Sequence, residues 1–211
     1  MFLAWFLFSF SSVSVGAPAS LPDALLAVQR EYQKNAGVTA EFEQRTDIKA
    51  TKSKKTAQGR IWIKRPDKIR WETLSPDPNI LISDGKTFWF YTPPFEKGER
   101  GQVIIKTSAQ VQTRFLNALL SGTFDFGKGQ AEITEKSKSV FLLKPKAGTA
   151  GDVSLATLIL STTGNKIEQV ILDHTSGNRT EIQLKEIRLT ASLEEKLFRY
   201  THDKNTDKIV E

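Results

Sequence analysis

The stretch that decides the fold is residues 58–93, which read QGRIWIKRPDKIRWETLSPDPNILISDGKTFWFYTP. It contains three of the chain's four Trp residues and most of its turn signals. Pro presets φ and Gly permits positive φ, so Ser-Pro-Asp-Pro at 75–78 and Ser-Asp-Gly-Lys at 83–86 are predicted turns. The β-branched and aromatic residues around these turns predict four consecutive antiparallel strands. The predicted strands are residues 60–64, 68–73, 79–82 and 87–91.

The two faces of this predicted sheet differ in character. Residues 68–73 alternate charged with apolar side chains, so one face is expected to be wet and the other dry. Ile69 and Trp71 fall on the dry face. Phe88 and Phe90 are assigned to the same face, because the Trp and Tyr that alternate with them carry polar atoms suited to a wetter position. We therefore expect these four side chains to line an apolar surface.

Arg65 has the same parity as Ile61 and Ile63, so period-two alternation directs all three side chains to one face. If that face is apolar, the guanidinium needs several acceptors, such as orphan helix carbonyls, because Arg cannot lose its proton. The alternative is an Arg at a strand end whose head lies in water. From this stretch alone, the second interpretation is favoured.

Several motifs in the stretch resemble a known family. They are Trp62-x-Lys-Arg65-Pro, the Trp71 that follows, and Ile-Ser-Asp-Gly-Lys-Thr-Phe-Trp-Phe-Tyr-x-Pro at 82–93. Together they are similar to the signature of the periplasmic outer-membrane lipoprotein carrier proteins, the LolA family. The likeness covers about the central third of the chain in one block, and a weaker likeness in strand and helix order extends over the rest.

The resemblance implies a mainly β (α+β) fold: an unclosed, strongly curved antiparallel β-barrel with a helical lid over an apolar cavity. In this family the acyl chains of a lipoprotein lie between lid and sheet. The residue that matches Arg65 ties the closed lid down through its backbone carbonyls. The implied partners are acylated lipoproteins, the inner-membrane lipoprotein-releasing transporter and an outer-membrane lipoprotein receptor.

The first residues of the chain differ from the rest. MFLAWFLFSF is followed by small residues ending in Ala-Pro-Ala, which predicts a signal peptide over 1–19, a periplasmic location and a single carrier domain over 20–211. The apolar run is shorter than the roughly 20 residues of a membrane-spanning helix. The apolar run begins directly after Met1, without the Lys or Arg that usually precedes it in a signal peptide, which leaves an uncleaved membrane anchor as the alternative. The chain has no Cys, so it lacks the acceptor that a lipid-anchored receptor would need.

The chain is basic, with a net charge of +6, and part of that charge is clustered. Residues 49–56 are expected to form a solvated hairpin loop that carries Lys49, Lys52, Lys54 and Lys55. No motif combines aromatic and basic residues as single-stranded nucleic acid would require, so nucleic acid is not an expected partner. The cluster instead indicates attraction to anionic membrane surfaces.

Outside the central stretch the pattern predicts two helices and more strands. One helix is expected over 21–34, where apolar residues recur at helical spacing. A second is expected over 103–120, where Phe115, Leu116 and Leu119 cluster on one side. It is the candidate lid, although ordinary core packing would give the same pattern. Strands are predicted at 38–48, 124–126, 131–136, 139–144, 153–161, 167–173, 180–189 and 197–201, and a frayed tail at 203–211.

The sequence offers little for catalysis. His174 and His202 have no acid or nucleophile at a recognised motif spacing, and no phosphate loop or Gly-x-Ser-x-Gly occurs. We therefore expect a non-enzymatic protein with no catalytic site, no metal site and no cofactor. The expected function is lipoprotein transfer between membranes; the alternative is a module of the same fold that senses lipid or protein and carries nothing.

Overall fold

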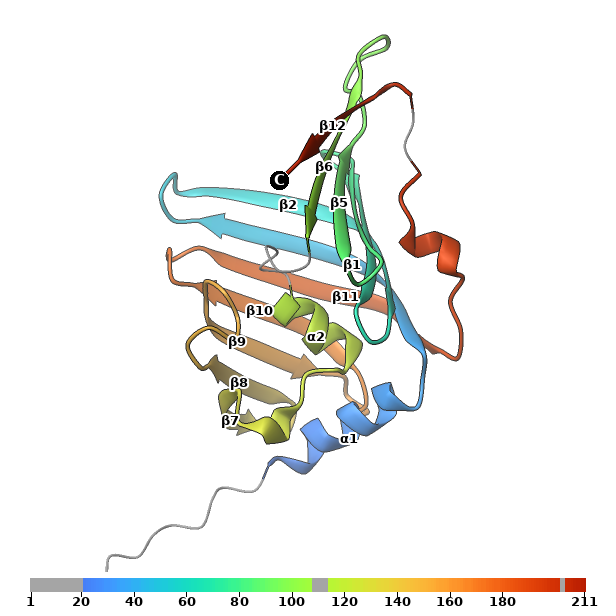
Figure 1. The fold of residues 1–211 in the computed structure, drawn as a ribbon. Helices are drawn as coiled ribbons and strands as arrows, with labels where there is room; N and C mark the ends of the chain where they lie inside the picture. The colour runs from blue at the N-terminus through green and yellow to red at the C-terminus, as the bar shows by residue number, and fades with distance from the viewer. Residues whose placement is uncertain (1–20, 108–113, 202–203) are drawn as a thin grey trace, which may run out of the picture.

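The computed structural model describes residues 21–107, 114–201 and 204–211, so the predicted signal peptide at 1–19 lies outside the described residues. These residues form one 12-stranded sheet with two α-helices on its concave side (Figure 1). None of the helices described is both long and apolar enough to cross a bilayer. The elements are α1 (Asp23–Gln33), β1 (Gly37–Ile48), β2 (Ser53–Lys64), β3 (Lys68–Ser75), β4 (Asn79–Ser83), β5 (Thr87–Thr92), β6 (Gly101–Thr107), α2 (Arg114–Ser121), η2 (Phe126–Lys128), β7 (Ala131–Ser137), β8 (Val140–Pro145), β9 (Val153–Leu160), β10 (Ile167–His174), β11 (Arg179–Thr190), η3 (Glu195–Phe198) and β12 (Thr206–Val210).

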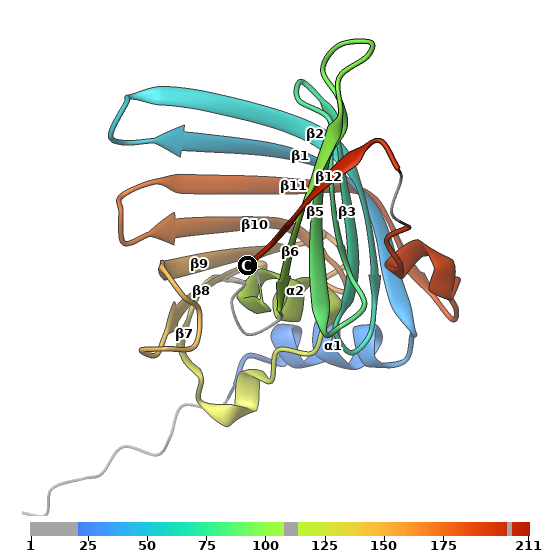
Figure 2. The ribbon, with the colours of Figure 1, turned by 45° about the horizontal axis from the view of Figure 1, so that its top comes forward.

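The sheet is open and strongly curved. Its strands follow the order β12-β6-β5-β4-β3-β2-β1-β11-β10-β9-β8-β7, so β12 and β7 are the two edges. Neighbouring strands are antiparallel except β12 and β6, which are parallel. Figure 2 shows the β3–β6 half turned across the half that contains β7 to β11. The predicted fold, an unclosed and curved antiparallel sheet with helices, is confirmed.

The central stretch forms β2 to β5, in the order that the sequence predicts. Gly85, in the turn between β4 and β5, has a φ of 97°, which few other residues adopt without strain. β2 is longer than predicted and begins at Ser53, inside the expected loop, because its polar residues pair with β1 from Ile48 onward. Backbone pairing needs no apolar side chain, so the hydrophobic pattern does not reveal this extension.

The second predicted helix is shorter than expected. Residues 103–107 belong to strand β6, which pairs with β5 from Thr87↔Thr107 to Thr92↔Gln102. Three β-branched residues in a row at 103–105 favour a strand there. Helix α2 begins at Arg114, and residues 108–113 lie outside the described ranges. The prediction of a helix over 103–107 is therefore wrong.

The C-terminal end also differs from the prediction. Residues 197–201, expected as a strand, contain the end of the 3-10 helix η3, and Phe198 in it is fully buried. The expected frayed tail contains β12, which pairs in parallel with β6 from Thr206↔Gly101 to Val210↔Ile105. Most side chains of this edge strand are exposed, so the strand has no hydrophobic pattern that a sequence could display.

The core lies between the two helices and the concave face of the sheet. α1 contributes three fully buried side chains, Leu25, Val28 and Tyr32. Phe124 and Phe126, expected in a strand, pack edge-to-face with each other instead, at a centroid distance of 5.2 Å. Across β8 to β11 the inward side chains are almost fully buried, whereas Trp71, Leu81 and Phe90 on β3 to β5 are only partly buried. The core therefore leaves space over β3, β4 and β5.

Candidate functional site

A cavity of about 680 Å³ lies between α2 and the concave face of β1 to β5. We name it the apolar cavity, because its floor is formed by Ile69, Trp71, Leu81 and Phe90 on the sheet, and Leu116 on α2 faces them. Its rim is polar. The remaining lining residues are Gln44, Thr46, Lys54, Lys55, Thr56, Ala57, Thr73, Pro76, Asp77, Asn79 and Asn117. A cavity with an apolar floor and a polar rim suits an amphipathic ligand, apolar at one end and polar at the other.

Strand register builds the floor. Trp71 on β3 lies opposite Leu81 on β4, which lies opposite Phe90 on β5, so the three side chains form one row across the sheet. Phe42 supports the row, with its ring centroid 4.4 Å from that of Trp71. Leu116 approaches from helix α2 and faces the sheet across the cavity. The floor is therefore set by rigid strands, and the facing wall by a short helix.

The predicted cavity residues divide into two groups. Ile69, Trp71, Phe90 and Leu116 line the apolar cavity. The other three belong to the packed core beside it: Phe88, Phe115 and Leu119 are at most 5% exposed.

Leu81 lines the cavity but was not among the predicted residues. The sequence predicts its strand without assigning its faces, and the signal that identifies Leu81 is its register opposite Trp71.

Arg65 binds the C-terminal end of α1. Its Nη2 donates to the carbonyl oxygen of Gln33 at 2.7 Å and also to that of Asn35, and its backbone N–H donates to Ala36 O at 3.0 Å. The last carbonyls of a helix have no partner within it, and their partial negative charge attracts a cation. The guanidinium thus has carbonyl acceptors, contrary to the interpretation that the stretch alone favours. The bound helix is α1, whereas the candidate lid helix is α2.

The two helices touch where α2 ends. Gly122, directly after α2, has a φ of 71°, and a Cβ built on it would come within 2.4 Å of the Tyr32 Cβ. Tyr32 is buried in α1, and its hydroxyl oxygen accepts a hydrogen bond from Ile167 N at 3.2 Å. Burial raises the pKa of Tyr32 to about 12, which keeps the hydroxyl neutral. A chain of contacts therefore runs from Arg65 through α1 to the end of α2.

A charged cluster holds the C-terminal segment beside Arg65. Glu195 accepts hydrogen bonds from the Nζ atoms of Lys64 and Lys68, each at 2.6 Å. The hydrogen bond from Lys64, followed by that from Lys68, lowers the pKa of Glu195 to about 2. Lys64 also donates to Leu193 O at 2.9 Å. These contacts hold η3 against the start of β3.

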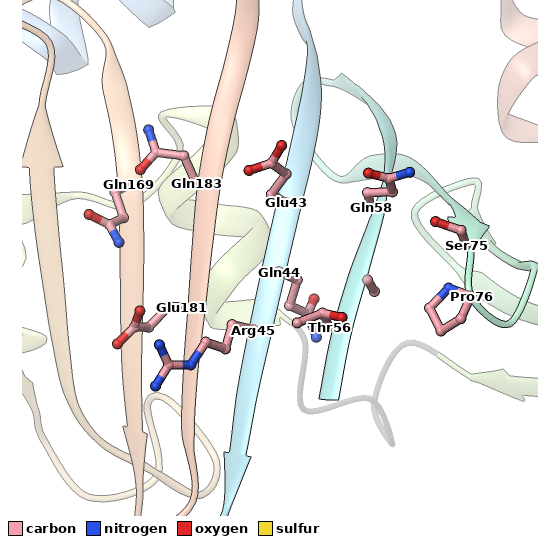
Figure 3. Close-up of a pocket in the computed structure, with 11 residues that line it drawn as sticks. Glu43, Gln44, Arg45, Thr56, Gln58, Ser75, Pro76, Gln169, Glu181 and Gln183 are labelled. Carbon is pink, nitrogen blue, oxygen red and sulfur yellow. The ribbon is translucent and has the colours of Figure 1, made fainter. Parts of the chain in front are cut away.

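A separate hollow of about 420 Å³ lies on the outer face of the sheet, opposite the helices (Figure 3). We name it the outer trough. Most of its lining residues are polar or charged, and Figure 3 shows them spread over β10, β11, β1, β2 and the end of β3. The lining residues are Glu43, Gln44, Arg45, Thr56, Ala57, Gln58, Ser75, Pro76, Gln169, Glu181 and Gln183.

The described residues contain no cluster of three His, Cys, Asp or Glu side chains that could hold a metal ion. His174 lies 3.1 Å from Asp152 Oδ2 through Nδ1 and 3.3 Å from Thr180 Oγ1 through Nε2, so it links the ends of β9, β10 and β11. The basic hairpin, defined as Lys49, Lys52, Lys54 and Lys55 at the β1–β2 end, is exposed, and its four side chains form no ion pair with any other described residue.

Two relatives of this chain carry the same name. The outer-membrane lipoprotein carrier protein of Pseudomonas aeruginosa is 32% identical over 208 residues, which cover 95% of this chain and 96% of that protein. The protein of the same name from Pectobacterium atrosepticum is 29% identical over 181 residues, covering 86% of this chain and 85% of that protein. Among solved structures, a LolA superfamily protein from Nitrosomonas europaea is 11% identical, with a TM-score of 0.49 over 84% of this chain and 96% of its own.

The family model described as outer membrane lipoprotein carrier protein LolA matches residues 33–201, which include β1 to β11, both strands beside Arg65 and the whole floor of the apolar cavity. This match spans most of the chain. The chain belongs to the LolA family of outer membrane lipoprotein carrier proteins.

Proposed function

We propose that this protein is a periplasmic carrier that binds the acyl chains of lipoproteins released from the inner membrane and delivers them to a receptor on the outer membrane. The names of its relatives support the cargo class. The observation that carries the proposal is the apolar cavity, whose hydrophobic floor lies open to a polar rim. Its volume, about 680 Å³, is within the range of known small-molecule sites.

The energetics explain why a carrier is needed. One acyl chain of about 15 methylenes gains at most roughly 12 kcal/mol on burial, at about 0.8 kcal/mol per methylene. An acylated lipoprotein therefore does not cross water at a useful rate without a carrier. If the whole free energy of burial appeared as binding affinity, the cavity would hold its cargo too tightly to release it. Release therefore requires a free-energy cost that opposes binding.

In this proposal, the hydrogen bonds of Arg65 are the source of the free-energy cost that opposes cargo binding. Its bonds to the carbonyls of Gln33 and Asn35 hold the end of α1 in place. Tyr32 of α1 lies against Gly122, directly after α2, the helix that faces the cavity. If cargo moves these helices apart, the bonds are lost, and the empty, closed state is stabilised relative to the loaded one. The free-energy cost of opening lowers the net affinity for acyl chains, so the cargo can be released to a receptor.

The proposal includes a signal peptide over 1–19, a mature domain over 20–211, an inner-membrane transporter that loads the protein and an outer-membrane receptor that unloads it. It assigns no catalytic step to any residue. Depletion of the protein followed by membrane fractionation tests the function. We expect lipoproteins to accumulate in the inner membrane; normal sorting to the outer membrane would refute the carrier role and favour a sensing module.

A further inference from the structure

The outer trough and the apolar cavity meet beside β2. Four residues line both hollows: Gln44, Thr56, Ala57 and Pro76. Pairing between β2 and β3 ends at Gln58↔Ser75, whereas β2 itself extends to Ser53. Past that last pair no described strand pairs with this side of β2, and the two hollows share their lining there, so that among the described residues they meet at an opening beside β2. An extended polypeptide can therefore pass from the rim of the cavity to the trough at this point.

β2 has a free edge along the opening. Residues 53–57 pair with β1, from Ile48↔Ser53 to Gln44↔Ala57, and in the described chain they have no backbone partner on their other side. Alternate residues of a strand direct their N–H and C=O groups to the same side. A peptide that lies along this edge would gain hydrogen bonds that do not depend on its own side chains.

The side chains that line the trough can also form hydrogen bonds with peptide groups. Gln169, Gln183, Glu43, Gln58 and Ser75 lie directly opposite one another on five adjacent strands and form one polar row across the outer face (Figure 3). Within the described residues the three Gln amides have no hydrogen-bonding partner, and each offers two donors and an acceptor.

The charges around this row are largely balanced. Glu43 accepts from Lys185 Nζ at 2.6 Å, and Glu181 accepts from Arg179 Nε at 3.0 Å. Arg45 donates to both carboxylate oxygens of Asp47, with the shorter bond at 2.9 Å. A trough of free amides and paired charges suits neutral peptide groups better than an anion or a cation.

We infer that the outer trough holds the polypeptide segment directly following the acylated end of the cargo. The inference rests on the proposed function: acyl chains occupy the apolar cavity, so the attached polypeptide has to leave from its rim. The opening beside β2, where the two hollows share lining residues, leads from that rim to the trough. Both the free edge and the amides bind peptide groups and not particular side chains, so one carrier can hold lipoproteins of different sequence.

Site-specific photo-cross-linking tests the path. The protein carries Gln58→p-benzoylphenylalanine or Gln183→p-benzoylphenylalanine and is loaded with a triacylated lipoprotein. We expect cross-links, mapped by peptide mass spectrometry, to the residues that follow the acylated Cys of the cargo. Arg188→p-benzoylphenylalanine, on the same strand as Gln183 but outside the trough, is the matched control. Equal cross-linking at the control, or none from the two trough positions, would overturn the inference.

Affinity measurements separate this inference from the proposed function. The triple variant Gln58→Ala, Gln169→Ala, Gln183→Ala should bind the triacylated lipoprotein about tenfold more weakly, because three hydrogen bonds of modest net strength are lost. Its affinity for the anchor alone, tripalmitoylated S-glyceryl-cysteine amide, should not change. Glu41→Ala, Arg60→Ala, Arg188→Ala is the control triple and should bind both probes as the unmodified protein does.

Unchanged binding of the lipoprotein by the trough triple variant, or an equal loss for the anchor alone, would contradict a peptide path through the trough. A different result marks failure of the proposed function: the unmodified protein would bind neither the lipoprotein nor the anchor. Cross-links from Gln58→p-benzoylphenylalanine to another copy of the chain, and not to cargo, would also refute the assignment of the trough to the lipoprotein.

Discussion

Replacement of Arg65 by Leu should make the protein hold its cargo more tightly and release it more slowly. The substitution removes the hydrogen bonds from the guanidinium to Gln33 O and Asn35 O and leaves a shorter, apolar side chain that has no donor. The closed, empty state loses these bonds, whereas the loaded state, in which the helices have moved, does not. Opening therefore costs less free energy in the variant.

The magnitude follows from the two contacts. A hydrogen bond from a charged donor contributes about 1.5–3 kcal/mol when buried, and the partial exposure of Arg65 reduces this to about 1 kcal/mol each. Together the bonds stabilise the closed state by about 2 kcal/mol, which corresponds to roughly a 30-fold change in the equilibrium. We expect the affinity for an acyl probe to rise by up to that factor. We expect the rate of transfer to acceptor membranes to fall by a similar factor.

A transfer assay checks this directly. The protein is loaded with a fluorescent acyl probe, mixed with acceptor vesicles and followed by stopped-flow fluorescence, while the Kd of the probe is measured separately. Arg60→Leu is the matched control, because Arg60 is exposed on β2, the strand that precedes Arg65, and among the described residues its ion pair is with Glu41 at 3.6 Å. If Arg65→Leu transfers its probe as fast as the unmodified protein, or binds it more weakly, the role assigned to Arg65 is wrong.

Three further predictions concern other parts of the molecule. Trp71→Glu places a charge on the floor of the apolar cavity and should weaken binding of an acyl probe by at least about tenfold, since an unpaired buried charge is costly; normal uptake would show that the floor is misassigned. Glu195 has its pKa lowered in the folded protein from 4.5 to about 2, so its stabilising contribution is present above about pH 4.5 and is lost as the pH falls toward 2. The protection of residues 193–198 from hydrogen exchange, measured relative to the intrinsic exchange rate at each pH, should therefore fall over that range, and Glu195→Gln should show lower protection already at neutral pH; equal protection in variant and unmodified protein would contradict the role of Glu195 in holding η3. Replacement of all four Lys of the basic hairpin by Gln should reduce sedimentation with vesicles rich in anionic lipid at low salt and leave neutral vesicles unaffected; unchanged sedimentation would exclude the hairpin as a membrane contact.

The central strands could be predicted from sequence because their signals are local. The turns at 75–78 and 83–86 contain Pro, which fixes φ, and Gly, which allows a positive φ, so each turn is visible in its own residues. The alternation of charged and apolar residues in β3 likewise lies within one strand. The same locality explains why Ile69 and Trp71 were assigned to the correct face. Leu81 needs the register: its place on the same face follows from its pairing with Trp71 and Phe90.

The parts that sequence missed depend on distant partners. The side chain of Arg65 finds its acceptors at the end of α1. The bond to Gln33 O spans 32 positions, and nothing in the residues next to Arg65 indicates it. β12 exists because β6 offers a free edge, and its exposed side chains have no pattern of their own. Residues 103–107 also extend the apolar spacing of the helix that follows them, and their pairing with β5 decides that they form a strand. Tertiary pairing decides in each case where the local pattern is ambiguous.

Native mass spectrometry tests the central claim most directly. The unmodified protein is mixed with a purified triacylated lipoprotein, and in parallel with the same lipoprotein stripped of its acyl chains. The account predicts a one-to-one complex with the acylated form, no complex with the stripped form, and loss of the complex in Trp71→Glu. Recovery of only the free chain with the acylated lipoprotein in excess, or equal binding of both forms, would contradict it.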